Sequence, residues 1–330
     1  MNINYFPGGN TGRGFVNLFD GIIAPWEKGF YTYILKGGPG VGKNTLMKKV
    51  VERANRLGLD VELFYCASDS ESLDAVKIIQ NKIVVLDGTA PHMIDPIYPG
   101  AVDEIINLGH FKNQRKFGTY LNEIEDLLGE NKLHYTIAYS YLRSAMELKN
   151  NTIEIIKSAM NIDKLDRWLL EKIGKNDGEN VGTRRLFSSA ITPDGIIDLS
   201  DSDFDVKLSG FTGLVAMNRL QKIVGGRKKE MFLDPLGTFT PKSINLLNER
   251  LTFVTDYKDG ESECDEFLIK KEYNFISCVI TQIDNLIRNA TDELFKCKAV
   301  HCQVEQLYRA FVDYDKVNDE TEKLMFKIGL

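Results

Sequence analysis

The chain lacks any apolar run long enough to cross a membrane, and it is poor in cysteine. A membrane-spanning helix needs about 18 or more consecutive apolar residues, and none of that length occurs among the 330 residues. Met1–Pro7 has no basic stretch followed by an apolar one, so we expect no secretory signal. The five cysteines are an odd number without regular spacing, which favours a reducing compartment. We therefore expect a cytoplasmic protein without membrane contact.

Basic clusters are also scarce. The formal net charge is −6, and the short cluster Arg227-Lys228-Lys229 stands alone. Nucleic-acid-binding arms carry longer basic runs, so the charge pattern predicts no nucleic-acid partner. Apolar residues make up 43% and charged residues 27% of the chain, which is the balance of a globular protein. The length favours two domains.

Short β-branched and aromatic runs alternate with amphipathic segments in the first third of the chain. Strands are predicted at residues 30–36, 60–66 and 82–87. A helix is predicted from Thr45 and a short one over 71–78, and the region 121–173 is expected to be helical. Alternating strands and helices predict a mostly parallel sheet of the α/β class.

The second half of the chain repeats features of the first half in the same order. Segment 6–18 matches 187–199, and segment 163–165 resembles 315–317. The matched pairs are Thr11 with Thr192, Gly14 with Gly195, Leu18 with Leu199, Glu62 with Glu230, and Asp87 with Asp256. The shared order predicts a duplicated α/β unit. Its copies are expected at 1–180, with a helical extension at about 115–175, and at 181–330.

An apolar seam lies near the end of the second copy. Apolar residues spaced alternately by four and three run from Ile276 to Phe311, with Cys297 and His301 among them. This spacing predicts a long helix with one apolar stripe. The stripe is expected to pack against an antiparallel helix of the same chain, and a homodimer through the long helices is the alternative.

The most specific pattern is Gly37-Gly38-Pro39-Gly40-Val41-Gly42-Lys43. In the G-x-x-x-x-G-K motif, or P-loop, backbone N–H groups surround phosphates, the following helix directs its positive end at them, and the lysine adds a cation. A predicted strand precedes the loop and a predicted helix follows it, as the motif requires. We expect a nucleoside triphosphate to be bound by Gly38, Pro39, Gly40, Val41, Gly42, Lys43, Asn44 and Thr45.

Two residues are candidates for holding Mg²⁺. The Ser or Thr that usually follows the lysine is replaced by Asn44, whose carbonyl oxygen a hard cation can accept. Asp87 ends an apolar strand, which is the position of a Walker B carboxylate. We expect Asn44 and Asp87 to be the metal ligands. The guanine-binding pattern Asn-Lys-x-Asp is absent, which favours ATP and leaves GTP open.

Further polar residues are expected at the same edge of the sheet. His92 is a candidate for orienting water or contacting the γ-phosphate, and the alternative is a loop histidine bonded to backbone. Asp69 is a candidate for holding Mg²⁺ or a substrate hydroxyl, or else caps a helix. Arg184 and Arg185 precede a strand predicted at 186–191, which is expected to complete the first sheet. They are interpreted as a surface pair, with neutralisation of transition-state charge as the alternative.

The second copy has no matching glycine loop. When Gly210 and Gly213 are aligned with Gly37 and Gly40, Val215 and Ala216 occupy the place of the Gly-Lys pair. Side chains there would prevent the close backbone approach that phosphate binding needs. The second copy is therefore predicted to be degenerate.

Long motifs of the chain resemble a bacterial family of tandem P-loop proteins that are described only as ATPases. The motifs lie at 36–43, 66–74, 85–92, 95–104 and 185–195, so the likeness covers most of the chain. The resemblance implies a duplicated P-loop NTPase fold, with phosphate bound by Gly38, Gly40, Gly42 and Lys43. It also implies that Asp87, His92 and Asp69 lie in shared loops. The chain departs from the family at Asn44 and in its second half.

The leading hypothesis is a Mg²⁺-dependent ATPase with one active and one degenerate site. Lys43, Asp87, His92 and Asp69 are its expected catalytic residues. One alternative is a phosphotransferase that acts on a small-molecule hydroxyl. The other is a non-hydrolysing ATP sensor whose long helices act on a protein partner.

Overall fold

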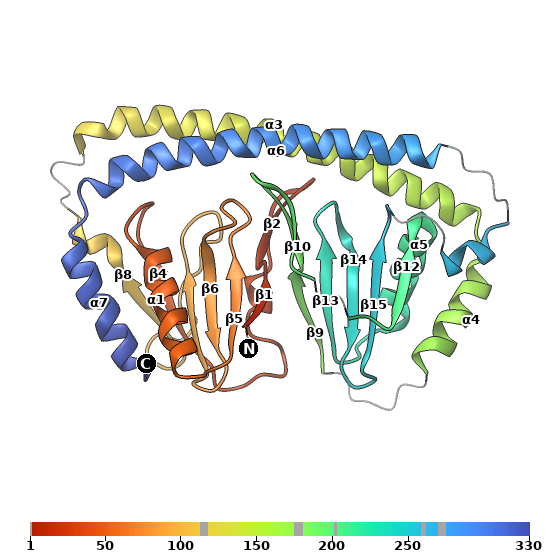
Figure 1. Cartoon of the computed structure of the whole chain (residues 1–330), viewed down its shortest axis with the longest axis horizontal. Helices are drawn as coiled ribbons and strands as arrows, with labels where there is room; N and C mark the ends of the chain where they lie inside the picture. Colours follow the sequence, from red (N-terminus) through yellow and green to blue (C-terminus); the bar gives the residue numbers. More distant parts are fainter. Residues whose placement is uncertain (1, 113–117, 175–180, 201–202, 259–261, 270–274) are drawn as a thin grey trace.

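Two β-sheets lie side by side beneath a pair of long helices in the computed structural model of the chain (Figure 1). The structure describes residues 2–112, 118–174, 181–200, 203–258, 262–269 and 275–330. Parallel and antiparallel strand pairs occur in both sheets. The α/β class is therefore confirmed, and both sheets are mixed.

The first sheet has the strand order β1-β5-β6-β7-β4-β8. Its strands are β1 (Asn2–Tyr5), β4 (Tyr31–Lys36), β5 (Val61–Tyr65), β6 (Leu73–Ile78), β7 (Ile83–Asp87) and β8 (Asp103–Asn107). All of them run in one direction except β6, which runs in the opposite one. The strands predicted at 30–36, 60–66 and 82–87 are confirmed, and α1 (Lys43–Arg56) follows β4 as expected.

The helix predicted at 71–78 is wrong, because this segment contains strand β6. All six residues of β6 are buried, and the strand pairs with β5 on one side and β7 on the other. A short, continuously apolar segment does not by its periodicity distinguish a central strand from a buried helix. Pairing with two neighbouring strands decides the outcome here.

The second sheet repeats the order and the directions of the first. Its order is β12-β15-β14-β13-β9, which corresponds to β4-β7-β6-β5-β1. The strands are β9 (Thr183–Phe187), β12 (Val206–Ser209), β13 (Lys229–Asp234), β14 (Gly237–Leu246) and β15 (Leu251–Asp256). Helix α5 (Gly210–Ile223) follows β12 as α1 follows β4. The expectation that the strand near 186–191 completes the first sheet is wrong, because β9 pairs with β13.

Each half also contains a small hairpin in a corresponding place. The hairpins are β2 (Gly8–Thr11) with β3 (Gly14–Asn17), and β10 (Ser189–Thr192) with β11 (Gly195–Asp198). Thr11 Oγ1 donates to the Gly14 carbonyl at 2.8 Å, and Thr192 Oγ1 donates to the Gly195 carbonyl at 2.9 Å. Both glycines have positive φ, +91° and +104°, a conformation that favours glycine. The matched segments therefore share one turn structure.

The two sheets meet edge to edge at a reciprocal backbone bridge. The Phe6 N–H donates to the Phe187 carbonyl at 2.9 Å, and the Phe187 N–H donates to the Phe6 carbonyl at 3.0 Å. These residues correspond to each other in the two matched segments. A residue that pairs with its own counterpart in both directions lies on an approximate two-fold axis.

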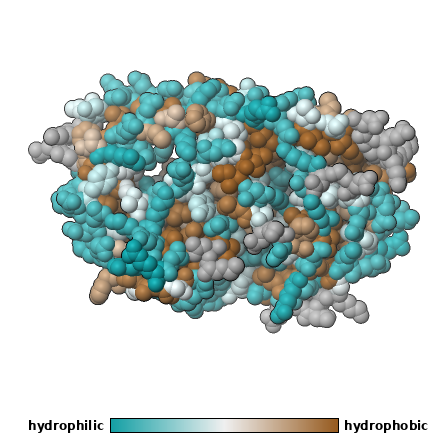
Figure 2. Space-filling model, viewed as in Figure 1, coloured by the Kyte–Doolittle hydropathy of each residue, from teal (hydrophilic) through white to brown (hydrophobic). Residues whose placement is uncertain are grey.

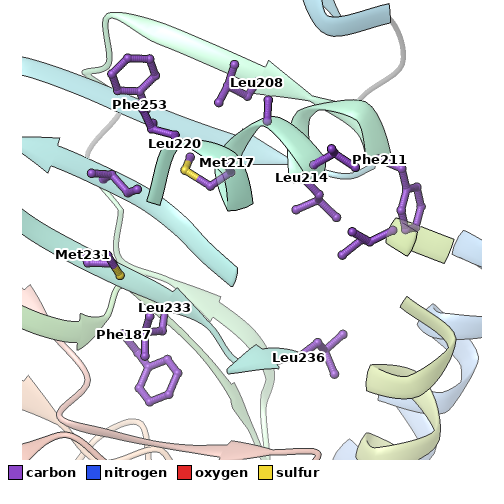
Figure 3. Packing of buried hydrophobic residues seen from close by; sticks show 14 of the residues in the cluster. Phe187, Leu208, Phe211, Leu214, Met217, Leu220, Met231, Leu233, Leu236 and Phe253 are labelled. Atoms are coloured by element: carbon purple, nitrogen blue, oxygen red, sulfur yellow. The ribbon is translucent and has the colours of Figure 1, made fainter. Parts of the chain in front are cut away.

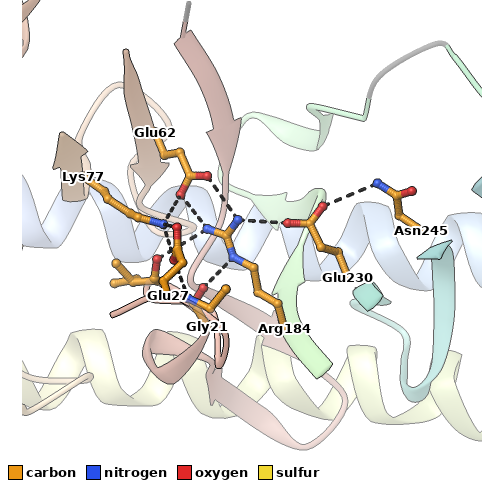
Figure 4. Close-up of polar contacts among 9 residues, drawn as sticks. Gly21, Glu27, Glu62, Lys77, Arg184, Glu230 and Asn245 are labelled. Carbon is orange, nitrogen blue, oxygen red and sulfur yellow. Dashed lines mark hydrogen bonds and ion pairs between the residues drawn. The ribbon is translucent and has the colours of Figure 1, made fainter. Parts of the chain in front are cut away.

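A buried arginine reinforces this junction (Figure 4). Arg184 on β9 bonds Glu62 of the first sheet at 2.6 and 3.1 Å and Glu230 of the second at 3.0 Å. Its Nε donates to the Gly21 carbonyl at 2.8 Å, and Lys77 Nζ also contacts Glu62 at 3.1 Å. The interpretation of Arg184 as a surface residue or a transition-state residue is therefore wrong, because it is 4% exposed and fully engaged in joining the sheets.

The long helices are exchanged between the halves. They are α3 (Leu121–Ser158), α4 (Ile162–Ile173), α6 (Ile276–Arg309) and α7 (Tyr314–Lys327). Helix α3 leaves the first half and α4 packs against α5, whereas α6 leaves the second half and α7 packs against α1. Helices α3 and α6 lie antiparallel to each other above both sheets (Figure 1). The expected helix at 121–173 is confirmed with one interruption, at which the Asn161 side chain caps α4.

The apolar seam of α6 is filled from within the chain. Ile283, Ile287, Leu294 and Cys297 are buried, and α6 packs along α3. The expected antiparallel packing within the chain is therefore confirmed for this seam. The placement of His301 on the seam is wrong, because its side chain is 51% exposed.

The short 3-10 helices of the described residues are η1 (Phe19–Gly21), η2 (Leu108–Phe111), η3 (Gly118–Tyr120) and η4 (Glu263–Phe267). In the second half, Leu214, Met217 and Leu220 of α5 belong to one buried cluster with Leu208 and Phe253 of the sheet (Figure 3). Hydrophilic side chains predominate along the outer edge of the paired long helices (Figure 2). None of the described helices combines the length and the apolarity that a membrane crossing requires.

We expect Arg184→Met to lower the free energy of unfolding by about 3–5 kcal/mol, because it removes the cation that pairs with Glu230 and leaves Glu62 with Lys77 alone. Urea unfolding measures this change. The neighbouring exposed residue provides a matched control, since Arg185→Met removes the same charge from the same strand. Equal, small effects of the two substitutions would show that the junction does not depend on Arg184.

Candidate functional site

The loop between β4 and α1 has a backbone shape that its glycines permit. Gly37, Gly40 and Gly42 have φ values of +144°, +68° and +96°, which other residues rarely adopt. A Cβ atom at Gly40 would also lie 2.9 Å from the Glu305 carbonyl oxygen of α6. Both the conformation and the close packing therefore require glycine in this loop.

The loop presents backbone N–H groups without partners. Within the described part of the chain, the N–H groups of Gly38, Gly40, Val41 and Gly42 donate no hydrogen bond. The first N–H groups of α1 have no intrahelical acceptor, and no side chain caps this helix at Gly42. Free N–H groups at a helix N-terminus favour an anion. The loop and the helix together therefore form a concentrated set of hydrogen-bond donors.

Lys43 and Asp87 lie together at this loop, as the sequence predicts. Lys43 Nζ donates to the carbonyl oxygens of Gly37 and Gly38 at 2.7 and 3.2 Å, and it lies 3.5 Å from Asp87 Oδ2. Asp87 Oδ1 accepts hydrogen bonds from the Thr89 N–H and hydroxyl at 2.9 and 2.6 Å. Strands β4 and β7 are parallel neighbours, so both residues follow strand ends on one edge. One carboxylate oxygen of Asp87 thus faces the lysine.

Asn44 connects α1 to strand β6. Its Oδ1 accepts a hydrogen bond from the Leu73 N–H at 3.2 Å, and its Nδ2 donates to Ser72 Oγ at 3.0 Å. The next residue, Thr45, is exposed on α1. Asn44 therefore uses its carbonyl oxygen to hold β6, whereas Asp87 Oδ2 is turned toward Lys43.

Asp69 is held by Ser72 and by Lys298. It accepts a hydrogen bond from Ser72 and lies 3.0 Å from Lys298 Nζ of α6. Burial opposes its ionisation, but the hydrogen bonds from Ser72 and Lys298 outweigh burial and lower the pKa of Asp69. This carboxylate therefore joins the loop after β5 to α6.

His92 is buried beside the site, and its two ring nitrogens have no hydrogen-bond partner among the described residues. Its ring stacks on Phe19 with 4.5 Å between the ring centroids, and its Nε2 lies 4.0 Å from Asp74 Oδ1. Burial lowers the pKa of His92 to about 4 although the charge of Asp87 acts in the opposite direction. The alternative of a backbone-bonded loop histidine is wrong, and the ring is neutral near pH 7.

Asp74 is the residue of this site that sequence reasoning missed. It is the second residue of β6, is 4% exposed and has an Oδ2 atom without a partner in the described chain. Burial raises its pKa to about 8, and the charge of Asp87 acts in the same direction. A buried Asp inside an apolar run was the available indication, and the mistaken helix at 71–78 hid its position at the sheet edge.

The corner between α6 and α7 covers the glycine loop. The Tyr314 hydroxyl donates to the Gly40 carbonyl at 2.8 Å, and a Cβ atom at Gly38 would lie 2.5 Å from the Tyr308 ring. Lys112 Nζ lies over the same ring, 4.3 Å from its centroid. Burial and the charge of Lys43 both lower the pKa of Lys112. A ligand on the loop would therefore lie close to residues from the end of the chain.

The corresponding edge of the second sheet has no loop at all. Strand β12 ends at Ser209 and α5 begins at Gly210, so the alignment of Val215 and Ala216 with a Gly-Lys pair is wrong. Lys149 of α3 is fully buried at this edge, pairs with Asp234 and lies 4.2 Å from the Tyr257 ring centroid. The phosphate-loop residues are therefore missing from this half, and a protein ion pair lies at the edge instead.

A cavity of about 350 Å³ lies on the other face of the first sheet. Ile34, Val84 and Leu86 line it, whereas the alternate residues of these strands pack toward α1. Phe19, which stacks on His92, also lines the cavity. The cavity is therefore separated from Lys43 by the sheet and by the packed histidine.

Comparisons with known proteins found no match for this chain. No protein-family model matches the chain. No curated protein and no solved structure matches it. Among the described residues, no group of three or more His, Cys, Asp or Glu side chains could hold a metal ion. Any Mg²⁺ at this edge would therefore need ligands from a bound phosphate and from water.

We expect the stability gap between Asp74→Asn and the wild type to grow with pH. The raised pKa means that the native state binds a proton more tightly than the unfolded state, so this stabilisation is complete below about pH 4 and is lost as pH rises toward about 8. The side-chain amide of the Asp74→Asn variant does not titrate, so the variant does not lose this stabilisation as pH rises. Urea unfolding from about pH 5 to about pH 8 should show the variant gaining up to about 1.4 kcal/mol per pH unit. A gap independent of pH would contradict a buried proton on Asp74.

Proposed function

We propose that the chain binds a nucleoside triphosphate at the loop Gly37–Lys43 and is a Mg²⁺-dependent ATPase. One observation supports this above the others: unpaired loop N–H groups, a helix N-terminus, Lys43 and Asp87 lie together at one sheet edge. Polyphosphate is the ligand that such a donor set suits best. ATP is the proposed nucleotide, and GTP is the alternative.

We further propose that the chain is a duplicated P-loop unit with one active and one degenerate site. Matching strand orders, the matching Thr-to-Gly turns and the Phe6–Phe187 bridge support the duplication. Direct passage from Ser209 to Gly210 supports the degeneracy, because no loop remains to surround a phosphate. Active and inactive halves would then share one scaffold.

The residues present fit Mg²⁺ if the metal arrives with the nucleotide. Asp87 Oδ2 provides one hard oxygen near Lys43, and Mg²⁺ in nucleotide sites commonly uses one or two carboxylates, phosphate oxygens and several waters. Asn44 is a poorer ligand, since its Oδ1 already accepts from the Leu73 N–H. When bound, the metal would neutralise charge on the phosphates, and Asp87 would orient it.

We expect Lys43→Ala to weaken ATP binding by about 10-fold to 100-fold, because a charge-assisted contact contributes about 1.5–3 kcal/mol. Isothermal titration calorimetry with ATP at millimolar Mg²⁺ measures the change. Lys48→Ala is the matched control, since Lys48 lies on the same helix and is exposed. Absence of saturable ATP and GTP binding by the wild type would refute the proposal.

A second candidate function is a nucleotide sensor. The contact between Tyr314 and Gly40 favours it, because it attaches the loop to the α6–α7 corner. Helix α6 continues from there to the second half, where Ile283 and Ile287 enter the main core. A nucleotide on the loop would then shift helices that a protein partner could recognise. A small-molecule phosphotransferase remains an alternative without such a supporting contact.

Phosphate release separates the ATPase from the sensor. We expect the wild type to release phosphate from ATP in a Mg²⁺-dependent manner and Lys43→Ala to lower the rate, because the lysine contacts the transferring phosphate in such loops. Steady-state phosphate detection with Lys48→Ala as control measures this. ATP binding without release above the Lys43→Ala level would favour the sensor over the ATPase.

A further inference from the structure

Strand β6 brings a second carboxylate to the edge that carries Asp87. This strand runs antiparallel to β7, so β6 begins where the parallel strands end. The register pairs Ala75 with Leu86, and the next position on each strand places Asp74 opposite Asp87. Cross-strand neighbours lie close together. Asp74 therefore belongs to the same edge as Asp87 and Lys43.

Asp74 and His92 have polar atoms that the protein leaves unsatisfied. Both residues are 4% exposed, and Asp74 Oδ2, His92 Nδ1 and His92 Nε2 have no partner within the described residues. A buried polar atom without a partner costs about 1–3 kcal/mol. Folded proteins keep few such atoms, and a catalytic role is one reason for them. These atoms therefore indicate a ligand that supplies the missing hydrogen bonds.

The other carboxylates near the edge already have partners. Asp69 is bonded to Ser72 and paired with Lys298, and Asp87 faces Lys43. Gly88 follows Asp87 directly, so no acidic residue stands next to it in the sequence. Asp74 is the carboxylate at this edge with an uncommitted oxygen among the described residues.

The second half lacks the same carboxylate. Ala75 pairs with Phe64 and Leu86, and Ser243 pairs in the same way with Phe232 and Val254. The residues next to these pairs show that Lys242 holds the place of Asp74 and Thr255 holds the place of Asp87, so the sequence match of Asp87 with Asp256 is wrong by one residue. The half without a glycine loop therefore lacks both carboxylates at these positions.

We propose that Asp74 in its ionised form is a catalytic residue that accepts the proton of the attacking water, with His92 as a positioning residue that holds Asp74. The proton that Asp74 holds near neutral pH passes to solvent before the water attacks. This inference rests on the nucleotide site proposed above. The water oxygen forms a bond to the γ-phosphorus while the bond from that phosphorus to the β,γ-bridging oxygen breaks. The bond's electron pair leaves with the nucleoside diphosphate, and one water proton passes to Asp74 Oδ2. His92 Nε2 lies 4.0 Å from Asp74 Oδ1 and is the neighbouring group that orients the carboxylate.

Asp74→Asn tests the proposal in the full chain. We expect phosphate release to fall by about 100-fold or more, the usual effect of removing a general base, while the ATP dissociation constant stays unchanged. Asp103→Asn is the matched control. Asp103 is also a buried carboxylate with one unpartnered oxygen in the same sheet, but it begins β8 beside Thr32, at the far end of β4. Asp103→Asn should have the same rate of phosphate release and the same ATP dissociation constant as the wild type.

A binding measurement gives a readout besides turnover. Wild type should bind ADP with aluminium fluoride, which mimics the transferring phosphoryl group, more tightly than ADP alone. Asp74→Asn should lose this increase and keep its ADP affinity. His92→Gln, which retains a donor, should keep more turnover than His92→Phe, which retains only the stacking on Phe19.

Four results would overturn the inference in distinguishable ways. Unchanged phosphate release by Asp74→Asn would remove Asp74 from catalysis and leave the nucleotide site standing. Parallel loss of ATP affinity and turnover would show a structural role. Wild type that binds ATP without releasing phosphate would exclude an attacking water. A wild-type protein without ATP affinity would refute the proposed function and, with it, the proposed role of Asp74.

Discussion

The junction at Arg184 is the constraint on which the arrangement of the two halves depends. A buried guanidinium is stable only when its donors are satisfied, and here Glu62 and Glu230 satisfy it from opposite sides. The two glutamates hold corresponding places, since Ile3 pairs with Glu62 and Arg184 pairs with Glu230. Two arginines across the axis would repel each other; Arg184 contacts both anions, and Lys77 adds a second cation beside Glu62. The symmetry between the halves is therefore broken at this pair of positions, where Ile3 occupies the place of Arg184.

The exchange of helices extends this coupling to the edge that carries the glycine loop. Helix α7 comes from the second half and packs on α1, and Tyr314 contacts Gly40. The glycine loop is thus completed by residues more than 250 positions away, as the 274-residue separation of this contact shows. Helix α4 likewise comes from the first half and packs on α5 of the second. A ligand on the loop would therefore act on contacts that both halves share.

Local patterns predicted the parts of the fold and site that neighbouring residues determine. The strand before the loop, the glycines with positive φ and the meeting of Lys43 with Asp87 follow from short-range sequence. The repeated Thr-to-Gly turn was also visible as a sequence match. Prediction failed at β6, where burial on both faces erased the periodicity that separates strand from helix. That error concealed Asp74.

The sequence by itself determined a repeated α/β pattern and one glycine loop beside a strand-end carboxylate, because backbone conformation and hydrophobic spacing are local properties. Only the tertiary structure decided that Arg184 lies between two sheets, that the seam of α6 packs on α3, and that Asp74 begins its strand at the edge where β7 ends. These outcomes depend on which distant segments become neighbours. Burial and pairing then determine the charge state and the partners of an ionisable residue, and no short stretch of sequence contains that information.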